Sequence, residues 1–158
     1  MNRFVMVAFG VALLAGSAQA KPAQEHFTVP EGWKLMPGPD SGVVAYQTAE
    51  RKEDSLIVVL RPIKAPGQTP QRWAEDEVAA IERQGFKLVE PPAQMTAGSA
   101  SFIKMASWND LAGFGLRNEQ YFCVHPDKEG ILEAAILGPE QFFESQRGSI
   151  QELLASLR

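Results

Sequence analysis

The chain has 158 residues, of which 45% are hydrophobic and 22% are charged. This balance excludes an intrinsically disordered chain, which needs low hydrophobicity and a high net charge. The formal net charge of -4 argues against nucleic acid as the main partner, because phosphate binding requires a basic surface. A single cysteine excludes a disulfide-stapled miniprotein and a cysteine-rich metal module.

Residues 1–20 have the three parts of a secretory signal peptide. Arg3 gives the positive start, Phe4 to Leu14 is apolar, and residues 18–20 (Ala-Gln-Ala) have the small-x-small form that signal peptidase accepts. We therefore expect cleavage after Ala20 and export to the periplasm or the exterior. The apolar stretch is short for a membrane span and no cysteine follows it, so we expect neither a span nor a lipid anchor in the mature chain.

The mature part, residues 21–158, is long enough to bury one hydrophobic core without disulfides, and we expect a single domain. Short apolar or alternating segments between turn residues predict its strands. These segments are residues 26–29, 33–36, 43–48, 56–60, 86–90, 94–97, 100–109, 115–125 and 131–137. Their short links imply antiparallel neighbours.

The first helix is predicted after Thr69-Pro70, a capping residue followed by proline at the first helical position. Trp73, Val78 and Ile81 recur at helical spacing, residues 75–77 are assigned to the outer face, and Gly85 ends the helix.

The second helical stretch begins at Pro139 and carries an apolar stripe from Phe142 to Leu157. Gly148 interrupts this stripe, and Ser149 with Glu152 has the form of a capping box. One kinked helix and two short helices both fit the sequence.

Residues 56–60 and 131–137 are apolar without strict alternation, which is typical of strands covered on both faces. We therefore predict an α/β fold of the α+β type, in which a mainly antiparallel sheet lies between the inter-strand helix and the C-terminal helix. A sheet with one wet face is the alternative.

This order of elements resembles the PsbP-like α/β/α sandwich, a group that includes the DcrB-like periplasmic proteins. The matching features are Phe27 to Pro30 with Gly32-Trp33, a hairpin across residues 37–42, the helix around Trp73, the later antiparallel strands and the C-terminal helix. The resemblance implies an exported accessory or adaptor module without enzymatic activity, and it carries over no functional residue.

Cys123 and His125 lie two residues apart on one strand, so their side chains share a face. They could be two metal ligands or a thiol–imidazole pair, but a zinc site needs three or four ligands and free cysteines are commonly buried. We expect a buried, unreactive Cys123. The acidic groups fall on an outer helix face or in loops, so we predict no catalytic residue, no cofactor and no metal.

The turn from Asn109 to Phe114 carries apolar residues where polar ones are usual. Exposed apolar clusters often mark contact sites, so Trp108, Leu111 and Phe114 are the candidate interaction residues. The alternative is that this turn folds back onto the core.

These observations favour an exported, non-enzymatic accessory or binding module whose partner is an envelope protein or a small ligand. A small exported hydrolase with an unrecognised site and a carrier of a hydrophobic ligand are the alternatives. Convergent carboxylates with perturbed pKa values would favour the hydrolase, and a closed apolar cavity would favour the carrier.

Overall fold

The computed structural model describes residues 23–37, 42–49, 55–111, 114–127 and 129–158. It contains one seven-stranded sheet in the order β1-β2-β3-β7-β6-β5-β4, and every neighbouring pair is antiparallel. The strands are β1 (Lys34–Met36), β2 (Val44–Gln47), β3 (Ile57–Ile63), β4 (Lys87–Ala97), β5 (Ala100–Leu111), β6 (Phe114–Val124) and β7 (Ile131–Pro139). The helices are η1 (Ala23–Glu25), α1 (Pro70–Arg83) and α2 (Glu140–Ala155).

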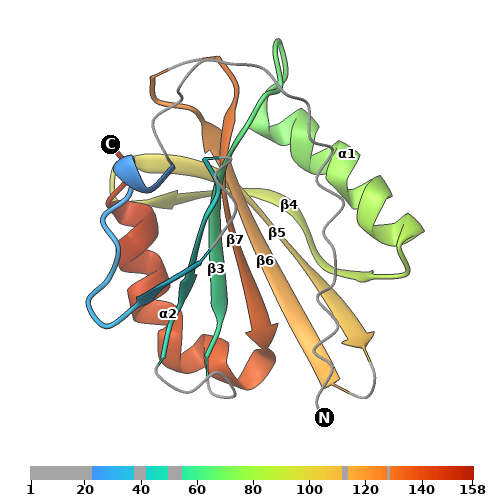
Figure 1. The fold of residues 1–158 in the computed structure, drawn as a ribbon. Helices are drawn as coiled ribbons and strands as arrows, with labels where there is room; N and C mark the ends of the chain where they lie inside the picture. The colour runs from blue at the N-terminus through green and yellow to red at the C-terminus, as the bar shows by residue number, and fades with distance from the viewer. Residues whose placement is uncertain (1–22, 38–41, 50–54, 112–113, 128) are drawn as a thin grey trace.

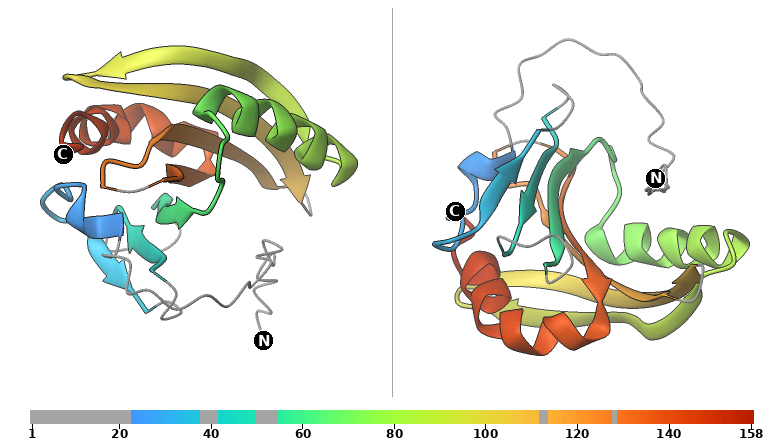
Figure 2. Two further views of the ribbon diagram at one scale, coloured as in Figure 1. Left: turned by 90° about the horizontal axis from the view of Figure 1, so that it is seen from above. Right: turned by 60° about the horizontal axis from the view of Figure 1, so that its bottom comes forward.

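The fold class is confirmed: an antiparallel sheet with one helix between strands and one at the C-terminus. The sheet twists strongly, so that β4 and β5 run across the direction of β1 to β3 (Figure 2). In the described part of the chain, no helix is long and apolar enough to cross a membrane.

The two helices lie on opposite faces of the sheet, as the apolar runs predicted (Figure 1). On β6, Tyr121 and Cys123 belong to the core cluster that includes Phe143 and Leu153 of α2. Phe122 between them belongs to the cluster that contains residues of α1. Because successive strand residues point to opposite faces, this alternation fixes which helix covers which face.

α1 begins and ends where its sequence predicts. Thr69 caps α1 by accepting a hydrogen bond from the Arg72 backbone N–H at 3.2 Å, and Gly85 follows the helix with a φ of +83°, which glycine adopts without strain. α2 is one continuous helix through Gly148, where an added Cβ would meet no atom within 4 Å.

One strand prediction is wrong, and two predicted strands are a single one. Residues 26–29 form no strand; instead the backbone of His26 accepts a hydrogen bond from the N–H of Arg158 at 3.0 Å, which ties this segment to the end of the chain. Residues 86–90 and 94–97 belong to one strand, β4, which runs through Pro91 and Pro92 with shifts of register. β4 is an edge strand, where proline is tolerated because one side of the strand needs no partner.

Candidate functional site

The middle of β6 carries polar side chains on both faces of the sheet. Arg117, Glu119 and Tyr121 point to the α2 face, and Asn118 and Gln120 point to the α1 face. Each set joins a cluster of polar residues from other elements. The α2-face cluster consists of Glu90, Lys104, Arg117, Glu119, Tyr121, Glu140 and Arg147. The α1-face cluster consists of four interacting residues, Arg61, Glu77, Gln120 and Glu133, together with Asn118 and Ser107, which lie next to Gln120 on the same sheet face.

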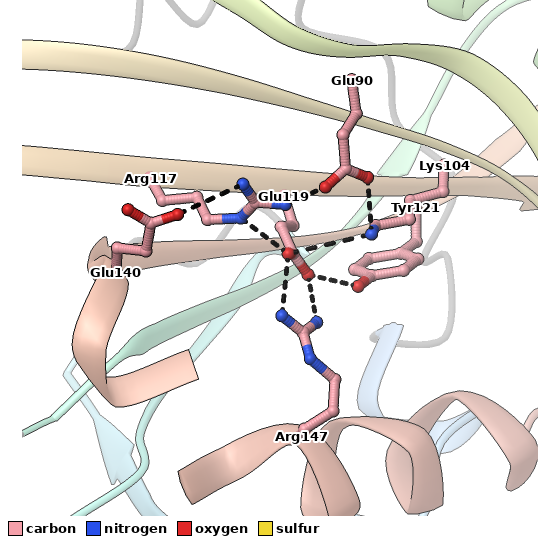
Figure 3. A network of polar contacts seen from close by, with 7 residues as sticks. All are labelled: Glu90, Lys104, Arg117, Glu119, Tyr121, Glu140 and Arg147. Carbon is pink, nitrogen blue, oxygen red and sulfur yellow. Dashed lines mark hydrogen bonds and ion pairs between the residues drawn. The ribbon is translucent and has the colours of Figure 1, made fainter. Parts of the chain in front are cut away.

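Glu119 is the centre of the α2-face cluster and is fully buried (Figure 3). Its Oε1 accepts from Arg117 Nε at 2.8 Å and from Arg147 Nη2 at 3.1 Å. Its Oε2 accepts from Arg147 Nη1 at 2.7 Å and from the Tyr121 hydroxyl at 2.5 Å. Lys104 Nζ lies 3.8 Å from Oε1. Both carboxylate oxygens of Glu119 therefore have donors.

The pKa values follow from these contacts. Burial would raise the pKa of Glu119, but the hydrogen bonds from Arg147, Tyr121 and Arg117 outweigh it and lower this pKa to about 2. Burial and the neighbouring Glu119 charge raise the pKa of Tyr121, so its hydroxyl keeps its proton. The cluster is an ionised, internally compensated network that joins α2 to the sheet.

The α1-face cluster is built around Glu133 of β7, which is also fully buried. Arg61 of β3 pairs with Glu133 Oε2 through its Nε, and Gln120 Nε2 donates to Glu133 Oε1 at 3.0 Å. Gln120 also hydrogen-bonds to Glu77 of α1. Burial and the charge of Glu133 raise the pKa of Glu77, in spite of the opposing effects of Arg61 and Gln120. This is a pair of interacting carboxylates beside one arginine.

Three buried side chains of this cluster have a polar atom without a hydrogen-bond partner in the described structure: Ser107 Oγ, Asn118 Oδ1 and Gln120 Oε1. Ser107 and Asn118 stand opposite each other in the β5–β6 register, and Gln120 follows two residues along β6. A buried unpaired polar atom costs about 1–3 kcal/mol, and most such atoms in folded proteins are paired. Three of them on one sheet face make this cluster a candidate for a ligand site.

The cluster could hold a polar group by hydrogen bonding, or use Glu77 as a proton donor. It does not have the composition of a metal centre, because the described residues contain no group of three histidine, cysteine or acidic side chains that could hold a metal ion. The α1-face cluster is therefore the candidate functional site, and the α2-face cluster is its structural counterpart.

Of the residues predicted to form a contact at the β5–β6 turn, only Trp108 has a described side chain, and it points to the face opposite the α1-face cluster. Trp108 is half-buried on the α2 face, where an added Cβ at Gly115 would collide with its indole ring. Leu111 and Phe114 are register partners at the ends of β5 and β6. The side chains of Leu111 and Phe114, and residues 112–113 of the turn, lie outside the described part of the structure, so the contact stays a prediction.

Cys123 is buried, as predicted, and burial raises the pKa of its thiol to about 12. The Sγ atom lies 3.6 Å from the Leu132 carbonyl oxygen. His125 packs edge-on against His26, with ring centroids 4.8 Å apart, and its Nδ1 accepts from the Asp127 backbone N–H at 3.2 Å. The histidines thus hold the start of the described chain against the β6–β7 connection.

The α1-face cluster has no motif in the sequence. The prediction that Glu77 lies on the outer face of the first helix is wrong: Glu77 is half-buried and bonded to Gln120. The available signals were Glu133, the one charge inside an apolar strand, and the amides at 118 and 120 within a central strand. Charged and amide side chains in the middle of buried strands are unusual, because these residue types are mostly exposed.

No family model matches the chain, and no curated protein matches it. Solved structures with the same fold do. The crystal structure of LpqN, involved in cell envelope biogenesis of Mycobacterium tuberculosis, matches with a TM-score of 0.60 and 14% identity over 81% of this chain and 78% of LpqN. A crystal structure from Bacteroides thetaiotaomicron VPI-5482 matches with a TM-score of 0.57 and 10% identity over 84% of this chain. The chain spans only 43% of that protein.

Proposed function

We propose that this protein is an exported, non-enzymatic binding module of the cell envelope that holds a small polar ligand between α1 and the sheet. The observation that carries the proposal is the set of buried oxygens on Ser107, Asn118 and Gln120 that lack partners in the described structure. Keeping them costs stability, and a bound ligand is the simplest compensation, since binding sites commonly retain polar groups that the fold alone does not need.

The placement in the envelope has two supports. One is the signal peptide predicted for residues 1–20, which lies outside the described residues, with cleavage after Ala20 and one domain over residues 21–158. The other is the shared fold with LpqN, which is itself an envelope biogenesis protein. Membership of the PsbP-like group, whose members are accessory modules, is part of the same proposal. Intact-mass analysis of the exported protein should show a chain that begins at Lys21.

A hydrolase is the second candidate, because Glu77 has a raised pKa and lies beside Glu133. General acid–base catalysis needs one protonated and one ionised group close together. However, Glu133 is held by Arg61 and by Gln120, so its oxygens already accept from protein donors. This arrangement favours ligand binding over hydrolysis of a bound substrate. A carrier of a hydrophobic ligand is less well supported, because polar atoms occupy the middle of this face.

The decisive experiment identifies what the protein carries. The protein is purified from its own cells under native conditions, denatured, and the released small molecules are analysed by mass spectrometry. We expect one polar compound to be released from the unaltered protein and lost from the double variant Ser107→Ala with Asn118→Leu. Equal recovery from both proteins would contradict binding at this cluster.

A matched control changes a serine on the same strand and face that lies outside the cluster. Ser101 is exposed, and its Oγ accepts from Gln94 Nε2 at 3.3 Å. Ser101→Ala should leave the released compound unchanged. Recovery of a cleaved product together with loss of turnover in Glu77→Gln would instead support the hydrolase.

A further inference from the structure

The α1-face cluster carries more negative charge than its described basic residue balances. Glu77 and Glu133 are its two carboxylates, and Arg61 pairs directly with Glu133. Arg61 acts on Glu77 only through the longer-range attraction of their charges. With both carboxylates ionised, the cluster has a net charge of -1 and Glu77 has no cation in direct contact among the described residues.

The orientation of Gln120 shows that the site offers an acceptor. Its Nε2 donates to Glu133 and its side chain also bonds to Glu77, so the amide nitrogen faces the two carboxylates. A flipped amide would place the oxygen against both negative charges, which excludes the exchange of Oε1 and Nε2. The atom without a partner in the described structure is therefore an oxygen.

Asn118 Oδ1 is a second buried acceptor, and the Ser107 hydroxyl rotates freely enough to accept as well. Asn118 and Gln120 are two residues apart on one strand face, which separates them by about 7 Å. Ser107 stands opposite Asn118, which places their Cβ atoms about 5 Å apart. The oxygens of Ser107, Asn118 and Gln120 thus form a row on the sheet face. A group that binds along this row needs several N–H donors spread over a few ångströms.

We propose, resting on the function proposed above, that the ligand presents a cationic nitrogen group, a guanidinium or a primary ammonium, to the α1-face cluster. Its N–H groups donate to the oxygens of Asn118 and Gln120, and its charge compensates Glu77. Guanidinium and ammonium groups carry donors and no acceptor, which matches a site rich in acceptors. A neutral hydroxyl compound would leave the excess charge in place, and an anion would add to it.

The oxygens of Ser107, Asn118 and Gln120 lie on a sheet face that α1 covers only in part. α1 packs against β4, β5 and β6. On the same sheet face, Val59 of β3 and Ala135 of β7 are only half-buried, and Arg61 is partly exposed. The side of the sheet face at β3 and β7, next to Arg61, is therefore the side from which we infer that a small ligand approaches.

Isothermal titration calorimetry with three probes of equal chain length tests the proposal: butylguanidinium, butylammonium and butylurea. Butylurea has nearly the shape of butylguanidinium but is neutral and has an acceptor in place of one donor. We expect at least one cationic probe to bind about tenfold more tightly than butylurea, as the loss of a charge-assisted hydrogen bond implies. The stronger of the two cations identifies which nitrogen group the site prefers.

Variants locate the binding. Asn118→Leu removes an acceptor, and it should weaken the preferred cation about tenfold. Ser101→Ala should leave its affinity unchanged. If Asn118→Leu does not fold, Ser107→Ala serves in its place, because removing one hydroxyl from a strand is a smaller change.

Several outcomes would overturn the inference. Butylurea binding as tightly as the cations would show that charge is not recognised, while leaving a binding site in place. Binding of glucose or calcium, with no binding of the cations, would assign the row to a neutral ligand or a metal. Cation binding that Asn118→Leu and Ser107→Ala both leave unchanged would move the site elsewhere. Each of these results is separate from the mass-spectrometric test, which decides whether the cluster binds a compound at all.

Discussion

The two polar clusters on β6 differ in how completely their members are paired. Both are centred on a fully buried glutamate, Glu119 on the α2 face and Glu133 on the α1 face. Around Glu119, both arginines and the tyrosine donate to the carboxylate. Around Glu133, neighbouring side chains keep buried oxygens without partners in the described structure. Both clusters bury a charge, so incomplete pairing is the feature that separates the candidate site from the structural cluster.

The clusters also differ in their charge balance. The α2-face cluster has three carboxylates and three basic side chains, and Phe143 of α2 packs beneath two of the latter, with Arg147 Cζ 5.5 Å and Arg117 Cζ 5.9 Å from its ring centroid. The α1-face cluster has two carboxylates and one arginine. The first cluster balances its charges within the protein, whereas we propose that the second completes its contacts with an added cation.

The largest change in the free energy of unfolding is expected from Glu119→Gln. The change removes the charge that faces Arg117 and Arg147, and breaking a buried ion pair typically destabilises a protein by about 3–5 kcal/mol. The control is Glu140→Gln in the same cluster, since Glu140 is exposed and lies 3.8 Å from Arg117. It should cost less than about 1 kcal/mol. Urea unfolding measures both, and equal losses would show that Glu119 is not the centre of the network.

The loss of stability in acid should depend on Glu119 as well. Because the pKa of Glu119 is lowered from 4.5 to about 2 in the fold, its contribution to stability is present above pH 4.5 and is lost as the pH falls toward 2. Glu119→Gln should therefore be much less stable than the unaltered protein at pH 7 and should approach it near pH 2. A difference between the two proteins that stays constant from pH 7 to pH 2 would contradict this assignment.

Much of the fold is predictable from the sequence, because it depends on local patterns. Thr69-Pro70 and Gly85 mark the limits of α1, and the apolar run at residues 131–137 indicates a strand covered on both faces. Residues 26–29 have a strand pattern but no strand partner, since the end of the chain occupies their hydrogen-bonding groups. Local pattern predicts extended backbone and does not predict what pairs with it.

The clusters are less predictable, because their partners come from distant parts of the sequence. Glu133 meets Arg61, 72 residues earlier, only because β3 and β7 are neighbours in register. Arg147 reaches Glu119 across 28 residues through the packing of α2 on the sheet. Residues 75–77 are all acidic and are predicted to face solvent, but successive helix positions point in different directions, and Glu77 turns toward the sheet. Residue spacing could not show which carboxylates are compensated.

Ser107→Ala tests whether the α1-face cluster is incompletely paired. It should raise the stability of the protein, whereas Glu119→Gln should lower it. Removing a buried hydroxyl that has no partner in the described structure should stabilise the ligand-free protein by about 1 kcal/mol. Ser101→Ala, on the same strand but exposed, should change stability by less than about 0.5 kcal/mol. Thermal unfolding of the ligand-free proteins gives the comparison. A clear loss of stability in Ser107→Ala would mean that its hydroxyl is already bonded and that the cluster is complete without a ligand.

Glu77→Gln should change stability least, and this change should depend on pH. Because burial and the charge of Glu133 raise the pKa of Glu77 in the fold, its ionised form costs stability at neutral pH, and this cost disappears as the pH falls through the raised pKa. The substitution should therefore stabilise the ligand-free protein slightly at pH 7, by less than about 1 kcal/mol, and the gain should vanish toward pH 4. Glu75→Gln on the exposed face of α1, where Glu75 accepts from Gln71, should show no such trend. Urea unfolding at pH 7, 5.5 and 4 follows the difference. If Glu77→Gln destabilises at pH 7 and not at pH 4, the Glu77 charge already has its partner within the protein, and the two faces of β6 would then carry two structural networks of the same kind.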